Sequence, residues 1–343
     1  RNRHRWHANR KRKMENLAVT AEWKGCLLDE YIVAHWPDIS KGRLRDLIRG
    51  GAINIEGMSV QPSAKLKEGQ LILIDHDMST EKRMKSADID LEILYQDEHL
   101  VAVNKPAGIP VEPSRWGEHP LHLSGALLSW AQKRELEGPL QQRPRALHRI
   151  DLGTTGVMLY ALSLEAERYY RELFANRKID KKYHALVLGE VHYPGVVDSP
   201  IAPDASAGGL MRVYKHGKES LTEYEALTIF HGYTLIEARP KTGRTHQIRV
   251  HMSSVGHPLV VDPRYGGAES FMLSEIKRDY RPKAGRPEKP LIDHLTLHAH
   301  SVSLPKFGSD EMLHIEAPYP KDLRVTLRNL AKWREARVGP WGN

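Results

Sequence analysis

The stretch Ala146-Leu-His-Arg-Ile-Asp-Leu-Gly-Thr-Thr-Gly156 runs directly into an apolar segment over residues 157–162. The Gly-Thr-Thr-Gly run predicts a tight turn, and the apolar segment after it predicts a buried strand. Asp151 therefore lies on a turn at the start of a strand, two residues after Arg149. A carboxylate beside a cation is expected to stay ionised, which a carboxylate nucleophile requires. An aspartate that caps a turn and pairs with Arg149 explains this segment equally well.

The composition of the chain limits the classes of protein to which it can belong. Its 343 residues predict one large domain or two unequal ones with an ample core. The net charge of +8 and the pI near 9.3 favour a polyanionic partner, nucleic acid rather than membrane. Because no apolar run could span a bilayer, we expect no membrane partner and no secretory signal. The single cysteine, Cys26, excludes an internal disulfide framework and is typical of the reducing cytoplasm.

Charge and apolar patterning divide the sequence into four segments. Residues 1–20 are rich in Arg and Lys and predict a basic, flexible arm. Residues 21–76 predict a small compact module, and the polar, patternless residues 77–90 predict a linker. Residues 91–335 carry the densest apolar pattern and predict a second, larger domain.

The small module contains two expected helices followed by strands. Apolar residues recur at helical spacing from Leu27 to Ile32, and Ser40 is a suitable cap for a helix that Gly50-Gly51 ends. Residues 52–60 predict a hairpin that turns at Glu56-Gly57, and residues 66–74 predict a further strand. The second helix presents a basic face made of Lys41, Arg43, Arg45 and Arg49. This order of helices and strands resembles the S4 RNA-binding domain.

The larger segment predicts an α+β domain built on a large mixed, mostly antiparallel sheet with flanking helices. Expected strands cover residues 93–95, 100–103, 182–188, 221–230 and 233–238, and expected helices cover 125–137, 164–175 and 321–337. Two prolines and a glycine in 104–111 predict a rigid loop, and the basic, Pro-rich residues 270–290 predict a surface loop.

A second cluster of polar residues lies in the segment 239–252. Lys241, Arg244 and Arg249 are close together in sequence, with Gln247 and two histidines between and after them. Crowded cations repel one another unless an anion gathers them, and a phosphate or the Asp151 carboxylate would serve. A surface strand with scattered charge is the alternative.

The nineteen histidines raise the question of a metal site. The pairs His246/His251 and His298/His300 are not accompanied by a carboxylate or cysteine in a recognised ligand pattern. The sequence also lacks the glycine-rich motifs that bind nucleotides and dinucleotides. We therefore expect no structural zinc site.

Four motifs together resemble the RluA-type pseudouridine synthases. They are Asn104-Lys-Pro-Ala-Gly, His148-Arg-Ile-Asp-x-x-Thr-Thr-Gly, Lys182-Tyr-x-Ala-Leu-Val-x-Gly and Lys241-Thr-Gly-Arg-Thr-His-Gln-Ile-Arg-Val-His, with further agreement over 256–266 and 297–299. The resemblance implies the pseudouridine synthase fold over 91–335 and the isomerisation of a uridine in RNA without cofactor or metal. Ile150, Thr155 and Val111-Glu112 depart from the usual pattern.

The resemblance also implies roles for individual residues. Asp151 matches the catalytic aspartate, which would attack C1′ or C6 or take a proton from the sugar. Arg249 matches the arginine that pairs with it, and Tyr183 matches the aromatic residue that packs on the base. Taken alone, Tyr183 would be an ordinary half-buried strand residue. Arg149 matches the residue that fills the gap left by the flipped base. The other expected RNA contacts are Lys105, His148, Lys241, Arg244, His246 and Gln247, with the basic face of the small module.

The expected partner is RNA, and the enzyme is expected to act as a monomer in the cytoplasm. The S4-like module and the basic arm favour ribosomal RNA, with transfer RNA as the alternative. Two rival classes are an inactive RNA-binding protein that retains the fold and a glycosylase that hydrolyses the same bond. A glycosylase usually needs a second carboxylate, and the Asp151 motif contains none.

Overall fold

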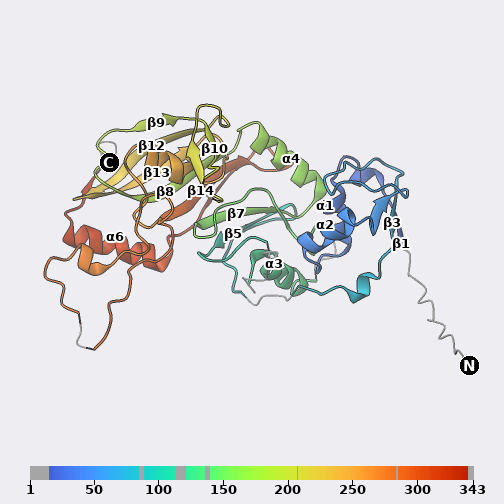
Figure 1. Cartoon of the computed structure of the whole chain (residues 1–343), viewed down its shortest axis with the longest axis horizontal. Helices are drawn as coiled ribbons and strands as arrows, with labels where there is room; N and C mark the ends of the chain where they lie inside the picture. The colour runs from blue at the N-terminus through green and yellow to red at the C-terminus, as the bar shows by residue number, and fades with distance from the viewer. Residues whose placement is uncertain are drawn as a thin grey trace, which may run out of the picture. The chain divides into compact units, whose positions relative to one another are not determined.

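The computed structural model describes residues 15–84, 89–112, 121–135, 140–206, 208–282 and 285–338. The chain divides into two compact units, and each is described separately below (Figure 1). The first contains residues 1–89 and 112–144, and the second contains residues 90–111 and 145–343. None of the helices in the described residues has both the length and the apolar character needed to cross a bilayer.

The first unit combines helices with a three-stranded antiparallel sheet. The sheet has the order β1-β3-β2, formed by β1 (Glu15–Ala18), β3 (Leu71–Ile74) and β2 (Ile53–Ile55). Both predicted helices are confirmed, as α1 (Leu28–His35) and α2 (Lys41–Arg49). The Ser40 side chain accepts a hydrogen bond from the Arg43 amide, so Ser40 caps α2. The unit also contains the short 3-10 helices η1 (Ala21–Trp23) and η2 (Met78–Thr80), and α3 (Leu123–Gln132).

Two expectations about the start of this unit need correction. Residues 15–18 are not part of a flexible arm, because β1 pairs with β3 along its full length, while residues 1–14 lie outside the described range. The turn at Glu56-Gly57 forms, with φ of 52° and 83°, but it does not lead into a hairpin ladder. A single bridge joins Ile55 to Met58, and β2 pairs instead with β3, which supplies two fully buried isoleucines. β2 therefore pairs with the distant strand β3, because this pairing buries apolar side chains.

The segment expected as a linker packs against the helices of the first unit as far as residue 84. Glu81 accepts two hydrogen bonds of 2.7 Å from Arg43, and Arg83 forms an ion pair of 2.7 Å with Asp38. Residues 112–144 also belong to this unit, because Arg143 donates to the Ile39 carbonyl over 2.8 Å. The compact units therefore differ from the boundaries 21–76, 77–90 and 91–335. The helix expected over 125–137 begins at Leu123 and ends at Gln132.

The second unit contains a mixed sheet of eleven strands, and this confirms the expected α+β fold class. Its main path is β16-β12-β13-β8-β14-β7-β5-β4, with β15 beside β14, β6 beside β7 and β9 beside β12. Figure 1 labels β5, β7, β8, β9, β12, β13 and β14 of this sheet. Among the described residues β7 and β14 are parallel, and the other neighbours are antiparallel. The strands are β4 (Ile93–Gln96), β5 (Leu100–Lys105), β6 (Arg145–Ala146), β7 (Thr155–Ala161), β8 (Asp180–Leu188), β9 (Gly195–Asp198), β12 (Leu221–Phe230), β13 (Tyr233–Pro240), β14 (Leu297–Pro305), β15 (Met312–Glu316) and β16 (Arg337–Val338). A separate pair is formed by β10 (Ile201–Pro203) and β11 (Met211–Val213).

Helices pack on this sheet through apolar residues. The predicted helix over 164–175 is confirmed as α4 (Leu164–Ala175), and its Tyr170 and Leu173 join the core of β5 and β7. The C-terminal helix α6 (Lys321–Trp333) is shorter than expected and packs Leu323 and Leu330 beside β8, β12 and β13. Residues 270–290 contain the short helix η3 (Leu273–Glu275) and are otherwise irregular where described. A further helix, α5 (Gln247–Ser254), begins in the segment 239–252, for which the sequence indicated a polar cluster or a surface strand but no helix.

A glycine allows β7 and β14 to approach closely behind the Asp151 turn. Gly156 has φ of +108°, a conformation that other residues rarely adopt. A Cβ atom at this position would lie 2.2 Å from the Ala299 carbonyl oxygen. The glycine therefore permits the parallel pairing of Gly156 with Ala299 and fixes the end of the turn that carries Asp151.

Candidate active site

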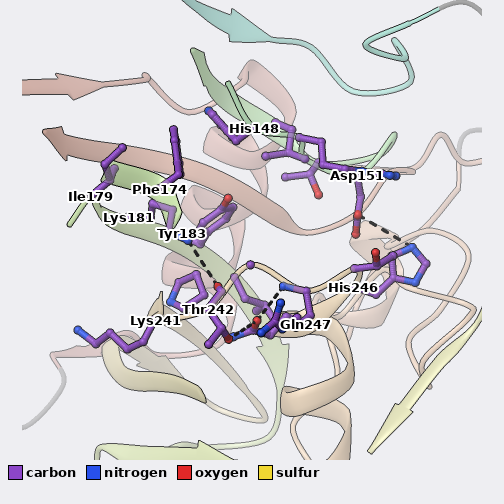
Figure 2. Close-up of a pocket in the computed structure, with 18 of the residues that line it drawn as sticks. His148, Asp151, Phe174, Ile179, Lys181, Tyr183, Lys241, Thr242, His246 and Gln247 are labelled. Carbon is purple, nitrogen blue, oxygen red and sulfur yellow. Dashed lines mark hydrogen bonds and ion pairs between the residues drawn. The ribbon is translucent and has the colours of Figure 1, made fainter. Parts of the chain in front are cut away.

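The second unit contains a cavity of about 500 Å³ with Asp151 on its wall (Figure 2). Five parts of the unit line it: the turn before β7, the C-terminal end of α4, the start of β8, the segment from β13 into α5 and the start of β14. Residues far apart in sequence therefore meet at one site, including Asp151, Tyr183 and Arg249.

The Asp151 turn is fixed from beneath by a buried lysine. Lys105 is fully buried, and its ammonium donates hydrogen bonds of 2.9 Å to the carbonyls of Pro106, Leu152 and Thr154. Burial lowers the pKa of Lys105 to about 8, while the charge of Asp151 opposes this shift. The expectation that Lys105 contacts RNA is wrong, because its three donors are used on the protein backbone.

Arg249 connects Asp151 to a second, buried carboxylate. Its Nη1 donates to Asp151 Oδ2 over 3.0 Å. Its Nε and Nη2 donate to the two oxygens of Asp262 over 2.7 and 2.9 Å, and Asp262 is fully buried. Burial alone would lower the pKa of Arg249, but the hydrogen bonds and charges of both carboxylates raise it. The guanidinium is therefore a fixed cation aimed at Asp151.

His246 lies beside the Asp151 carboxylate (Figure 2), nearer the oxygen to which Arg249 does not donate. Its Nε2 is 4.0 Å from Asp151 Oδ1, and its Nδ1 is 2.7 Å from the Tyr265 hydroxyl. The backbone of His246 is left-handed, with φ of 56°, and precedes the first turn of α5. Burial lowers the pKa of His246 despite the opposing charge of Asp151. Near neutral pH the imidazole is therefore a neutral neighbour of the carboxylate.

Tyr183 faces the same cavity from β8 (Figure 2). Its side chain is partly exposed and packs against the core formed by β8, β13 and α5. Burial and then the negative charge of Asp151 raise the pKa of the phenol. Tyr183 thus presents a neutral aromatic ring and a protonated hydroxyl beside Asp151.

Gln247 does not point free donors into the cavity. It is buried, and its Nε2 donates to the Leu221 carbonyl and the Thr222 hydroxyl over 2.9 and 3.0 Å. Its Oε1 accepts from the Thr242 hydroxyl and the Arg244 amide. The expected RNA contact is therefore wrong, because Gln247 fastens the 242–247 turn to β12.

His148 lines the cavity as a neutral ring. Its Nε2 accepts a hydrogen bond of 3.1 Å from the Leu159 amide, and its ring packs against Phe174. Burial, with a contribution from the charge of Lys181, lowers the pKa of His148 to about 3. Any contact of His148 with RNA would therefore be made by a neutral ring, and the expected contact stays a prediction.

Three cations that the sequence predicted as RNA contacts lie around the cavity, and two of them already have partners in the protein. Lys241 Nζ is 3.0 Å from a Glu223 oxygen, and Arg244 Nε donates to the Glu219 carbonyl. Arg149 is exposed, and within the described part of the chain no carboxylate lies at ion-pair distance from it. The simple pairing of Arg149 with Asp151 is thus absent from the described contacts, since Arg249 takes that place.

The basic face of α2 is more nearly neutral than the sequence indicated. Lys41 pairs with Glu30, Arg45 pairs with Asp29 over 2.7 Å, and Arg49 pairs with Asp46 over 3.1 Å. Arg43 binds Glu81, as described above. These four side chains keep 20–47% of their surface exposed, so the face retains cations that are partly engaged.

Sequence reasoning gave no role to Asp262, Lys181 or Phe174. Asp262 lies in the segment 256–266, which agrees with the family pattern, so the sequence pointed to this segment. It did not indicate that Asp262 binds Arg249. Lys181 immediately precedes the Lys182-Tyr183 motif and lines the cavity. In the described residues no three His, Cys, Asp or Glu side chains converge as metal ligands.

Comparison with known proteins identifies the family. The chain is 31% identical over 94% of its length to the ribosomal large subunit pseudouridine synthase D of Pseudomonas aeruginosa, covering 97% of that protein. The chain belongs to the RNA pseudouridylate synthase family. The family model for RNA pseudouridylate synthases matches residues 99–254. The corresponding synthase D of Escherichia coli K12 is 32% identical over 89% of this chain and 90% of its own.

A solved structure shares the fold of this RNA pseudouridine synthase. Human RNA pseudouridylate synthase domain containing 4 superposes with a TM-score of 0.54 and 25% identity. The match covers 72% of this chain and 94% of the human one. The chain is thus an RNA pseudouridine synthase, an isomerase that acts on uridine in RNA.

Proposed function

We propose that this synthase converts specific uridines of large-subunit ribosomal RNA to pseudouridine, with Asp151 attacking the nucleotide. The observation that carries the proposal is the shared guanidinium of Arg249, which binds one oxygen of Asp151 and leaves the other beside the cavity. The names of the bacterial relatives support ribosomal RNA as the substrate.

The reaction assigns a task to each residue around the cavity. The N1–C1′ bond breaks, the uracil turns, and a C5–C1′ bond forms while C5 loses a proton and N1 gains one. Arg249 holds the Asp151 carboxylate in place at the cavity wall, and Tyr183 stacks on the base. Base flipping exposes N1 and C5, and Arg149, at the exposed rim, fills the gap left in the RNA.

Binding of the RNA rests on cations spread over both units. Lys241 and Arg244 lie at the cavity, and the S4-like region over 21–76 adds the partly exposed side chains of α2. Most of these cations already pair with carboxylates, which RNA phosphates must displace. Because binding uses many phosphate contacts, we expect affinity to fall steeply with salt. The enzyme works as a monomer in the cytoplasm under this proposal.

A glycosylase is the rival activity that the site geometry disfavours. Hydrolysis needs a positioned water and usually a second carboxylate with an accessible oxygen. Asp262 is the nearest candidate, but it is fully buried and both of its oxygens accept from Arg249. Asp151 therefore acts without a second acid in the described part of the site.

The test uses the full chain and RNA labelled with tritium at uracil C5. Large-subunit ribosomal RNA, isolated from cells that lack the gene, is compared with transfer RNA from the same cells. The proposal predicts tritium release from ribosomal RNA, matched by pseudouridine at mapped positions. Free uracil would show a glycosylase, release from transfer RNA alone would overturn the ribosomal target, and no release from either RNA would indicate an inactive binding protein.

A further inference from the structure

Lys181 is a cation of the cavity wall that has no carboxylate partner among the described residues. It lies in β8, two residues before Tyr183, and lines the cavity (Figure 2). Its Nζ donates a long hydrogen bond of 3.4 Å to the Thr242 carbonyl. Lys181 is partly buried. An ammonium that loses part of its hydration with so little compensation is costly, and such groups are usually paired.

The fully buried or nearly buried cations of the second unit, unlike the partly buried Lys181, have full partners. Lys105 donates to three carbonyls, Arg145 pairs with Glu167, and Arg249 pairs with two carboxylates. Burial lowers the pKa of Lys181 to about 8, and the adjacent Asp180 only partly opposes this. The contrast indicates that a ligand completes the surroundings of Lys181.

The position of Lys181 relative to Tyr183 limits what that ligand group can be. Side chains two residues apart in a strand point to the same face, about 6.5 Å from each other. In Figure 2 Lys181 and Asp151 lie on opposite sides of Tyr183. A base that stacks on Tyr183 with its N1–C1′ bond toward Asp151 therefore turns its opposite edge, C4 and N3, toward Lys181.

We infer that Lys181 reads the uracil base by donating a hydrogen bond from its ammonium to the C4 carbonyl oxygen of the target uridine. The inference rests on the proposed function of Asp151 and Tyr183. It makes Lys181 a specificity residue, because cytosine carries an amino group at C4 and would place a donor against the ammonium. The same hydrogen bond draws electron density from the conjugated C5–C6 bond, at which the base is rejoined.

The proposed role of Lys181 predicts a pH dependence of activity, to which the other titratable groups near Lys181 could also contribute. His148 is neutral, because burial lowers its pKa to about 3, and Tyr183 is protonated, because burial raises its pKa. Arg177 and Lys241 line the same cavity as cations, and Asp180 and Asp151 are the acids beside it. Loss of the Lys181 proton is thus one expected cause of an activity decrease as the pH rises through about 8. Lys105, whose pKa burial also lowers to about 8, is the second, and the Lys181→Arg variant separates the two.

The test compares Lys181→Met and Lys181→Arg in single turnovers at saturating RNA, with tritium release as the readout. Loss of a charged hydrogen bond predicts a decrease of about 10- to 100-fold in the Lys181→Met rate. The RNA Kd and its salt dependence should stay unchanged. Lys181→Arg should recover most of the rate and move the alkaline decrease to higher pH, since arginine keeps its proton.

Lys182→Met is the matched control, because Lys182 is the next residue of β8 and lies 3.7 Å from Glu237. Its rate should stay close to that of the unchanged enzyme. A Lys181→Met rate equal to that of Lys182→Met would overturn the inference. So would a loss confined to Kd with a salt slope lower by about one, which identifies a phosphate contact instead. Failure of the unchanged enzyme to release tritium would reject the proposed function itself.

Discussion

Arg249 distributes its donors between two carboxylates, and this division defines the site at the scale of single residues. Two donors bind the buried Asp262, and a third reaches Asp151 at the cavity wall. Asp262 therefore sets the direction of the guanidinium without touching the substrate. The geometry makes Asp262 a positioning residue whose effect should appear in both stability and turnover.

Asp262→Asn tests this positioning role. Neutralising Asp262 leaves the buried Arg249 guanidinium with Asp151 as its remaining carboxylate, and we expect a loss of about 3 kcal/mol in the free energy of unfolding. Turnover should fall with it, because Arg249 loses its fixed orientation. Denaturant unfolding and tritium release measure the two effects.

Glu223→Gln provides the control for that variant. Glu223 pairs with Lys241 over 3.0 Å, and both side chains are 41% exposed, so the loss should stay below about 1 kcal/mol. Equal losses in the two variants would contradict the positioning role of Asp262.

Lys105→Met tests the lysine beneath the Asp151 turn. The variant removes hydrogen bonds to three carbonyls, and the turn that carries Asp151 should loosen. We expect turnover to fall by about tenfold or more, while the salt dependence of RNA binding stays the same. A salt slope reduced by about one would show instead that Lys105 contacts a phosphate.

Single residues differ in how far the sequence predicts their role. The resemblance paired Asp151 with Arg249, and the structure places them 3.0 Å apart. Lys105 and Gln247 lie in the same family-like motifs, yet their donors bind backbone carbonyls and neighbouring hydroxyls. The sequence shows that a side chain is polar. It does not show whether that side chain will form its hydrogen bonds within the folded protein.

At the scale of elements, the Asp151 turn depends on the close approach of β7 and β14. Their parallel pairing at Gly156 and Ala299 leaves no room for a side chain on the glycine. The turn between β6 and β7 is thereby fixed at its C-terminal end, five residues after Asp151. Backbone packing, rather than side-chain contacts, therefore sets this part of the site.

Gly156→Ala tests the packing between these strands. Its Cβ atom would lie 2.2 Å from the Ala299 oxygen at a φ of +108°, so we expect a loss of more than about 3 kcal/mol in the free energy of unfolding. Gly243→Ala is the control, because nothing lies within 4 Å of its Cβ position. Similar stability of the two variants, measured by denaturant unfolding, would reject this account of the turn.

The elements that the sequence predicted are those with strong local signals. Ser40 followed by an apolar stripe gave α2, and the dense apolar spacing gave α4. The helix α5 was missed because it begins after a left-handed histidine in a segment of turn-forming residues. The expected hairpin at Glu56-Gly57 failed because β3, far along the chain, offers a better apolar partner.

At the scale of the whole molecule, the compact units do not follow the linear order of the chain. Residues 112–144 join the first unit through contacts such as that of Arg143 with Ile39, which are 104 residues apart. Composition and periodicity report on local segments, so they cannot reveal such a return of the chain. They did indicate the α+β class, because many short strands and few helices are a property of the whole sequence.

The stability of the molecule should decrease in acid through a buried histidine. His298 is fully buried, and burial lowers its pKa to about 4 from an unfolded value near 6.5. The unfolded chain thus takes up this proton first, and stability is lost as the pH falls from about 6.5 to 4. The expected loss is at most about 3 kcal/mol.

Unfolding of His298→Gln as a function of pH measures this contribution. The slope of the unfolding free energy between pH 4 and 6.5 should be smaller than in the unchanged protein. His192→Gln is the control, because that side chain is 56% exposed. An unaltered slope in His298→Gln would remove His298 from the account.

The central claim is that Asp151 performs the chemistry on the uridine, and Asp151→Asn tests it most directly. The substitution keeps the shape of the side chain and removes its charge. With C5-tritiated RNA and the full chain, we predict no detectable tritium release, while the RNA Kd stays close to that of the unchanged enzyme because binding rests on distributed phosphate contacts. Tritium release from Asp151→Asn at a substantial fraction of the unchanged rate would contradict the claim.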